Sequence, residues 1–120
     1  PIIALFTSDD GKINGPGYKE LAFVRLDGEA WCENAEVTNI TSVSKNAEFD
    51  NWSTWKQKNK KGADCGLSLS HTGNEIFLEV ENSGLITENR TVLPENISKI
   101  YFYFTGDQCA VTEIVKGKKR

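Results

Sequence analysis

The stretch that most restricts the fold is residues 97–105, a run of strand-forming side chains near the end of the sequence. Aromatic or β-branched residues fill positions 100–104 without a break, and no Gly or Pro occurs between 97 and 105. Such a run is too short to span a bilayer and too rich in strand formers for a solvent-exposed helix. It predicts a central strand covered on both faces. We expect residues 106–108 to turn the chain and residues 109–115 to return as the second arm of a hairpin.

The composition is that of one soluble globular domain. The chain has 120 residues, of which 38% are apolar and 26% charged, enough for a single core of its own. Its formal charge of −3 argues against a dedicated nucleic-acid binder. No stretch is long enough for a membrane-spanning helix, and the first residues lack the basic start of a signal peptide. We expect one domain over residues 1–115, with 116–120 as a basic, flexible tail.

Three cysteines stand at wide spacing, at Cys32, Cys65 and Cys109. Because no CxxC pair occurs and His71 is the only histidine, a structural zinc site is not expected. We interpret the cysteines as buried, reduced thiols of a protein made in the cytoplasm, with one disulfide and a spare thiol as the alternative. Neither a metal nor a cofactor is predicted.

Short alternating segments predict strands along most of the chain. Asp27 and Gly28 form a strong hairpin signal. Residues 8–17 contain three Gly and two Asp, and we interpret them as a loop in which Asp9 and Asp10 shape turns and do not bind calcium. The expected strands are residues 2–7, 18–26, 29–32, 37–43 (a polar edge or one-sided strand), the two arms of a hairpin over 63–81 connected by 71–74, and short irregular strands at 85–87 and 90–93.

Residues 44–62 leave two interpretations open. Phe49, Trp52 and Trp55 recur at three-residue spacing, and Asp50 could cap a helix. Against a helix, the Asn, Ser and Thr residues between them are mediocre helix formers, and the segment 52–55 also reads as a short strand. We favour a strand plus loop and keep a short helix as the alternative.

Together these segments predict an all-β fold. Seven to eight short strands at intervals of eight to twelve residues, with at most one short helix, indicate an antiparallel β-sandwich or jelly roll.

The residue types favour a protein that is not an enzyme. His71 lies at the expected tip of a hairpin, and we interpret it as a turn residue and not as a catalytic base. Glu79 and Glu81 stand two apart on one face of an expected strand, where solvent-facing acids are more common than a catalytic pair. No standard hydrolase, metalloprotease or nucleotide-binding motif occurs.

The strongest binding signal is the pair Trp52 and Trp55 beside four lysines. Aromatic rings among cations can stack on sugars or nucleobases, but such rings also fill cores and interfaces. We favour packing in the core or in an interface, then glycan binding, then nucleic acid, which the acidic balance opposes. The candidate interface residues are Tyr18, Trp52, Trp55, Lys56, Lys60, Lys118 and Lys119.

Four Asn-x-Ser/Thr triplets begin at Asn39, Asn51, Asn89 and Asn96. This mild excess would fit a glycosylated, secreted domain. We do not favour that interpretation, because the number of cysteines is odd and no signal peptide is recognised.

The order of features resembles small virion proteins of tailed bacteriophages. The resemblance rests on the apolar opening at residues 3–7, the glycine-rich turn at 15–18, the aromatic segment at 49–55, the hairpin at 66–80 and the closing aromatic hairpin. The lysine-rich segment 56–61 does not belong to that pattern.

The resemblance implies a β-sandwich subunit that serves as a capsid cement or decoration protein, or as a tail or fibre adaptor. It implies a location in the virion after synthesis in the host cytoplasm. The implied partners are other capsid or tail subunits, with this chain a homo-oligomer in the assembly, and not a membrane. The alternative is a carbohydrate-binding or lectin-like domain that uses Trp52 or Trp55 on a glycan. A small inhibitor or immunity-type protein is a third class.

Overall fold

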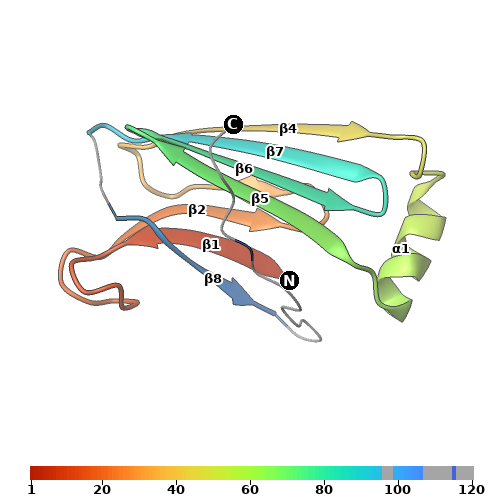
Figure 1. Cartoon of the computed structure of the whole chain (residues 1–120), viewed down its shortest axis with the longest axis horizontal. Coiled ribbons are helices and arrows are strands. Elements are labelled where there is room, and N and C mark those ends of the chain that lie inside the picture. Colours follow the sequence, from red (N-terminus) through yellow and green to blue (C-terminus); the bar gives the residue numbers. More distant parts are fainter. Residues whose placement is uncertain (96–98, 107–114, 116–120) are drawn as a thin grey trace.

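The computed structural model describes residues 1–95, 99–106 and 115. These residues form eight strands and one short helix, so the all-β prediction is confirmed. The elements in order are β1 (Ile2–Thr7), β2 (Lys19–Arg25), β3 (Ala30–Trp31), β4 (Thr38–Lys45), α1 (Trp52–Lys61), β5 (Cys65–Thr72), β6 (Glu75–Asn82), β7 (Leu85–Val92) and β8 (Tyr101–Thr105), as Figure 1 shows. None of the described helical segments is long and apolar enough to cross a membrane.

The strands form two antiparallel sheets that face each other as a sandwich (Figure 1). Sheet A has the strand order β3-β2-β1-β8, and sheet B has the order β4-β7-β6-β5. Helix α1 lies at one end of the sandwich and not over either sheet (Figure 1). The polar strand β4 lies at the edge of sheet B, which confirms the edge strand expected at residues 37–43.

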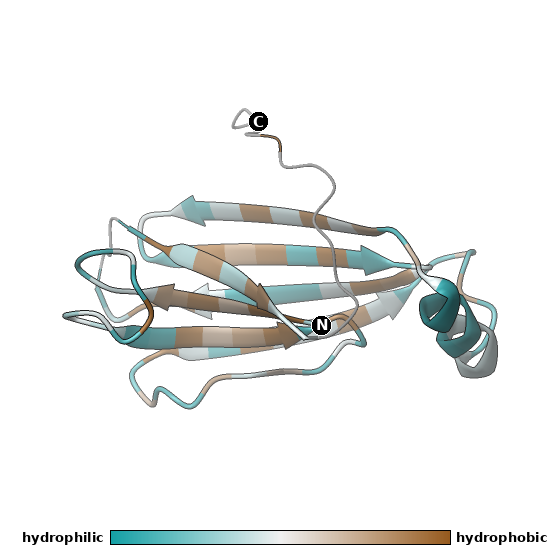
Figure 2. Cartoon of the chain, turned by 90° about the horizontal axis from the view of Figure 1, so that it is seen from below, coloured by the Kyte–Doolittle hydropathy of each residue, from teal (hydrophilic) through white to brown (hydrophobic). Residues whose placement is uncertain are grey.

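The core lies between β1 and β2 of one sheet and β6 of the other. It consists of two clusters of buried side chains. One cluster is Leu5, Leu21, Ala22, Ile76 and Leu93, and the other is Ile3, Val24, Leu78 and Val80. Figure 2 shows the consequence in colour: hydrophobic bands run along the strands, whereas the helix is largely hydrophilic. The alternation of β6 places Glu79 and Glu81 on the face opposite the core, as expected.

The hairpins predicted at Asp27–Gly28 and over residues 63–81 are present, the second with a shorter connection than expected. Gly28 adopts a φ of 97° between β2 and β3, where a side chain would be strained. In the second hairpin, His71 is part of β5 and pairs with Ile76, so the connection is only Gly73 and Asn74. The expected connection at residues 71–74 is therefore too long.

The interpretation of residues 85–87 and 90–93 as two irregular strands is wrong. Strand β7 is continuous, and it pairs without interruption along its whole length with β4 and with β6. Asn89 lies in the gap that was expected between those two strands, yet it is buried within β7 and hydrogen-bonded to Asn39 of β4.

The prediction that residues 97–105 form a central strand covered on both faces is also wrong. Within the described ranges, β8 pairs with β1 alone and ends sheet A, and Phe102 remains 44% exposed. The strand buried on both faces is β1, in which every residue from Ile3 to Thr7 is buried. The expected return of the chain at 109–115 lies outside the described residues apart from Val115, which is exposed and not in a strand.

The favoured strand-plus-loop interpretation of residues 44–62 is wrong, because a helix forms there. Asn51, and not Asp50, caps it: Asn51 Oδ1 accepts a hydrogen bond from the Thr54 N–H at 2.8 Å. Trp55 is buried, and its Nε1–H donates to the Asn82 carbonyl at 2.9 Å. The cap and the buried ring offset the weak helix propensity of the intervening polar residues.

The cysteines are less buried than expected. Cys32 and Cys65 are each half-buried. Cys109 lies outside the described residues.

Candidate interface on the outer face of sheet A

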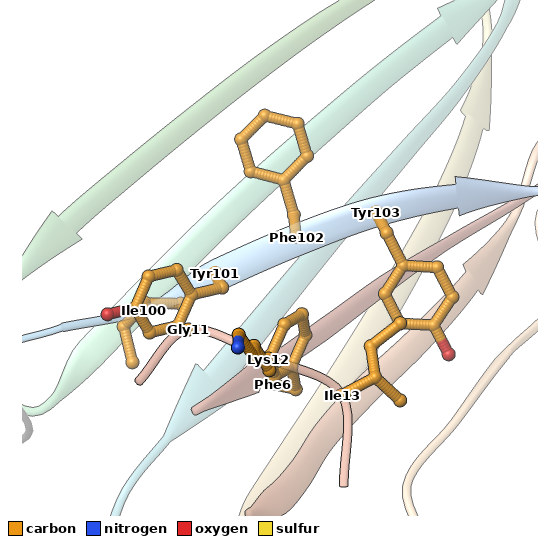
Figure 3. A pocket seen from close by; sticks show the side chains of 8 residues that line it. All are labelled: Phe6, Gly11, Lys12, Ile13, Ile100, Tyr101, Phe102 and Tyr103. Carbon is orange, nitrogen blue, oxygen red and sulfur yellow. The ribbon is translucent and has the colours of Figure 1, made fainter. Parts of the chain in front are cut away.

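The tyrosines of β8 point away from the core. Phe102 lies opposite the core residue Leu5 of β1, so Phe102 turns toward sheet B. Since successive side chains of a strand point to opposite faces, Tyr101 and Tyr103 turn to the outer face of sheet A. Figure 3 shows Phe102 directed away from Tyr103.

Phe6 gathers three tyrosines around its ring on this face. Its ring centroid lies 5.6 Å from that of Tyr18, 5.5 Å from that of Tyr101 and 5.8 Å from that of Tyr103. Phe6 itself is buried, so the tyrosines form the outer layer. Offset or tilted ring pairs at these distances are favourable beyond the area they bury.

A second pair of rings extends the same face across the sheet. Phe23 and Trp31 are directly opposite each other on β2 and β3, with ring centroids 5.5 Å apart and an interplanar angle of 18°. Ala4 separates the two groups, because it pairs with Phe23 on one side and with Tyr103 on the other. We call this surface the aromatic face; its residues are Phe6, Tyr18, Phe23, Trp31, Tyr101 and Tyr103.

The loop between β1 and β2 lies against one part of the aromatic face. It helps line a shallow, solvent-open pocket of about 480 Å³, whose lining combines rings with one cation. Gly11 is required there, since its φ is 74° and an added Cβ would lie 2.9 Å from Tyr101 Cε1. The lining residues, shown in Figure 3, are Phe6, Gly11, Lys12, Ile13, Ile100, Tyr101, Phe102 and Tyr103.

Asp9 and Asp10 shape this loop, as expected. Asp10 Oδ1 accepts hydrogen bonds from the Lys12 N–H at 3.0 Å and from Ser8 Oγ at 3.4 Å. The Asp9 N–H donates to the Pro16 carbonyl at 2.7 Å. Such bonds from Asp to the backbone two residues on are typical of turns.

Tyr18 sits at the junction of the loop and the aromatic face. Loss of contact with water raises the pKa of its hydroxyl above the usual 10.0, and the nearby Glu20 and Tyr103 raise it further. The phenol therefore stays protonated at neutral pH and can donate a hydrogen bond to a partner.

The predicted residues on α1 form a separate region at the end of the sandwich. Trp52 is 42% exposed, whereas Trp55 is buried and packs edge-on against Trp52 at a centroid distance of 5.5 Å. Lys45 Nζ lies 5.2 Å from the Trp52 ring centroid and 4.6 Å from that of Phe49. A cation thus already lies over the Trp52 ring.

The predicted interface residues therefore do not come together at one place. Tyr18 belongs to the aromatic face, near the loop end of the molecule, while α1 occupies the other end (Figure 1). Lys56 and Lys60 are exposed on α1. Lys118 and Lys119 lie outside the described residues.

Five residues of the aromatic face were not among the predicted site residues: Phe6, Phe23, Trp31, Tyr101 and Tyr103. The signal for two of them was present in the sequence. Tyr and Phe alternate from 101 to 104, and tyrosine prefers positions where its hydroxyl can reach water. Read with a period of two, that alternation places the tyrosines on an outer face.

The Asn-x-Ser/Thr triplets have structural uses where the structure describes them. Asn39 of β4 and Asn89 of β7 are diagonal neighbours across the strand pair and exchange amide hydrogen bonds of 3.0 and 3.1 Å. Asn51 is the cap of α1. Asn96 is outside the described ranges. The asparagines of these three triplets therefore have roles in the fold that involve no glycan. The amide of Asn89 is also buried, so it is inaccessible to glycosylation in the folded chain.

The fold and the site together define an all-β sandwich of two antiparallel sheets with an aromatic outer face. Comparisons with protein-family models, with curated proteins and with solved structures find no match.

Proposed function

We propose that this chain is a non-enzymatic structural protein of a virion, a capsid cement or decoration protein or a tail adaptor, that acts by contact with other subunits. The observation that carries the proposal is the aromatic face. Tyr, Trp and Phe are enriched in protein–protein interfaces and contribute most of the binding free energy there. The virion enters the proposal from the order of features in the sequence, which resembles small phage proteins.

The geometry of the aromatic face suits a preformed contact surface. Phe6 fixes three tyrosines and Phe23 supports Trp31, so little side-chain freedom is left to lose on binding. Trp31 is 37% exposed at the margin of the sheet and offers the largest ring to a partner. In an assembly of many copies, weak contacts of this kind are multiplied through avidity.

The alternative, a carbohydrate-binding or lectin-like domain, has less support. A ring that stacks on a sugar needs an open face. Trp55 is buried, and Lys45 lies over the ring of Trp52. Glycan binding by Trp52 would have to displace that cation or use the opposite face of the ring.

A binding assay on particles from the source of the protein tests the proposal. The wild-type chain should co-sediment with particles that lack it, and Trp31→Ala should weaken binding by about thirtyfold, the effect of losing a residue worth ~2 kcal/mol. Trp52→Ala is the matched control and should bind like the wild type. Absence of the chain from purified particles by mass spectrometry would defeat the proposal, and glycan-array binding lost in Trp52→Ala would favour the alternative.

A further inference from the structure

Among the described strands, both sheets end on the same side of the sandwich, at β5 and β8. Strand β1 packs over β6 in the core, with Ile3 against Leu78 and Val80. The next strand outward in sheet A is β8, and the next outward in sheet B is β5. These two strands therefore lie on the same side of the molecule (Figure 1).

The apolar layer between the sheets is open on that side. Leu67 and Leu69 of β5 lie opposite Val80 and Leu78 of β6, so both leucines face inward. Their partners on β6 are buried, yet Leu67 is 41% and Leu69 is 40% exposed. Phe102 of β8 also faces inward and is also exposed. We call Leu67, Leu69 and Phe102 the open seam.

Strand β5 lacks the features that usually protect a sheet edge. Edge strands in natural proteins carry charged side chains, proline or a bulge, which prevent pairing with another chain. No charged side chain and no proline occurs between residues 65 and 72. The register of β5 with β6 is unbroken from Cys65 to Thr72. On its other side, β5 pairs with no strand in the part of the chain that is described.

We propose that a second copy of this chain pairs with β5 in antiparallel orientation, so that sheet B continues from one copy into the other. The two-fold axis of such a pair is perpendicular to the sheet, and residues opposite each other point to the same face. With the axis at Leu69, this residue meets Leu69 of the second copy, and Leu67 meets His71 of the second copy. At the centre of the joint, Leu69 therefore covers Leu69 of the second copy, and the aliphatic part of each Leu67 packs beside an imidazole ring.

The sequence of β5 fits a copy of itself better than it fits a charged partner. Serines occupy the outer face at Ser68 and Ser70, and they lie opposite each other in the same register. Because no Asp, Glu, Lys or Arg occurs in β5, two copies meet without the repulsion of such like charges that normally separates identical edges. The occupant that the strand fits is thus a second copy.

The pair is expected to be weak. One strand edge and three exposed apolar side chains per copy place the contact below the ~1,200 Å² typical of stable complexes, so dimers should dissociate on dilution. A second copy of the chain is thus one partner for the contact role proposed above. The dimer itself does not depend on that proposed function; only its use in a larger assembly does. A test on the isolated chain therefore separates the failure of one from the failure of the other.

Analytical ultracentrifugation of the full chain over a wide concentration range gives the test. The wild type should shift from monomer to dimer as concentration rises. The double variant S68K/S70K places lysines along the proposed joint and should stay monomeric. The matched control is S42K/S44K, which adds two lysines to the outer face of β4, the other edge of sheet B; Ser42 lies opposite Glu88 just as Ser68 lies opposite Glu79. The control should dimerise like the wild type.

Hydrogen exchange on the wild type gives a second measurement that needs no variant. The backbone amides of β5 should exchange more slowly as concentration rises, and those of β4 should not change. A wild type that is monomeric at every concentration, or equal loss of dimer in both lysine variants, would overturn the proposal. Protection of β5 that does not depend on concentration would also overturn it, because the edge would then be covered within one chain.

Discussion

Asn39 and Asn89 form a polar network inside sheet B. The network uses both strands of the pair symmetrically: Asn39 lies opposite Thr91, and Asn89 lies opposite Thr41. Asn39 Nδ2 donates to Thr91 Oγ1 and Asn89 Nδ2 donates to Thr41 Oγ1, each at 2.9 Å. Two copies of the pattern Asn-x-Thr thus satisfy each other across antiparallel strands, which fixes the register of β4 on β7.

Asn89→Ala should destabilise the chain by about 2 kcal/mol, because it removes the hydrogen bonds of a buried amide and leaves the buried Thr91 hydroxyl without its acceptor on residue 89. Urea unfolding measures the loss. Ser42→Ala, on the exposed outer face of the neighbouring strand, should change the free energy of unfolding by less than about 0.5 kcal/mol. Equal stability of the two variants would contradict the role of the network.

Tyr18 makes the stability of the fold depend on alkaline pH. Because burial raises its pKa in the folded state, the folded chain holds the phenolic proton more tightly than the unfolded chain, whose pKa is near 10.0. The contribution of the protonated Tyr18 to the free energy of unfolding is fully present below pH 10. It is lost as the pH rises through the pKa of Tyr18 in the folded chain.

Tyr18→Phe should therefore lose less stability than the wild type between neutral pH and about pH 11. The measurement is urea unfolding at both pH values. The other tyrosines are present in both proteins, so the difference between the two slopes isolates Tyr18. Identical slopes would show that its proton has no linkage to folding.

At the scale of elements, α1 is held by its cap and by Asn82 of β6. The Asn82 side-chain N–H groups donate to Asn59 Oδ1 at 2.9 Å and to the Leu26 carbonyl at 3.2 Å, and the backbone carbonyl of Asn82 accepts from Trp55 Nε1–H. The helix is thus joined to both sheets through one buried side chain.

Asn51→Ala should cost about 1 kcal/mol of stability, since it removes the side chain that accepts the Thr54 N–H at the start of the helix. Asp50→Ala is the matched control one residue earlier and should cost much less. Thermal unfolding followed by circular dichroism compares the two. A larger loss in the Asp50 variant would assign the cap to the residue that the sequence first indicated.

Elements with a strict period of two could be predicted from the sequence, and those that depend on distant partners could not. In β2 and β6 apolar and polar residues alternate, and β1 is a continuous apolar run, so the local sequence pattern is enough to predict these strands. Helix α1 depends on the burial of Trp55 against β6, and β7 depends on hydrogen bonds to β4. Neither partner is visible in a local window of sequence.

The candidate site also divides into a part that the local sequence predicted and a part that depends on distant strands. The β1–β2 loop and Tyr18 were predicted from turn-forming residues and an adjacent ring. The rest of the aromatic face depends on the strand order β3-β2-β1-β8, which brings Trp31 and Tyr103 to one surface from distant parts of the chain. Strand order is a property of the whole fold, so the position of β8 at the end of sheet A could not be read from its own composition.

At the scale of the whole molecule, the two core clusters join the sheets into one unit. Leu5 of β1 belongs to the same cluster as Ile76 of β6, so removal of its side chain weakens the contact between sheets and not one sheet alone. Leu5 is buried, and a Leu→Ala change at such a site costs about 2–5 kcal/mol because a cavity remains.

Leu5→Ala should therefore lower the urea midpoint of both sheets together. Trp31 reports on sheet A and Trp55 reports on the end of β6, so their indole N–H signals in NMR spectra should disappear at the same urea concentration, in the variant and in the wild type. Val43→Ala, at an exposed position of the edge strand β4, should leave the midpoint nearly unchanged. Separate transitions for the two indole signals would mean that the sheets unfold independently. The apolar layer between the sheets would then be too small to couple their unfolding.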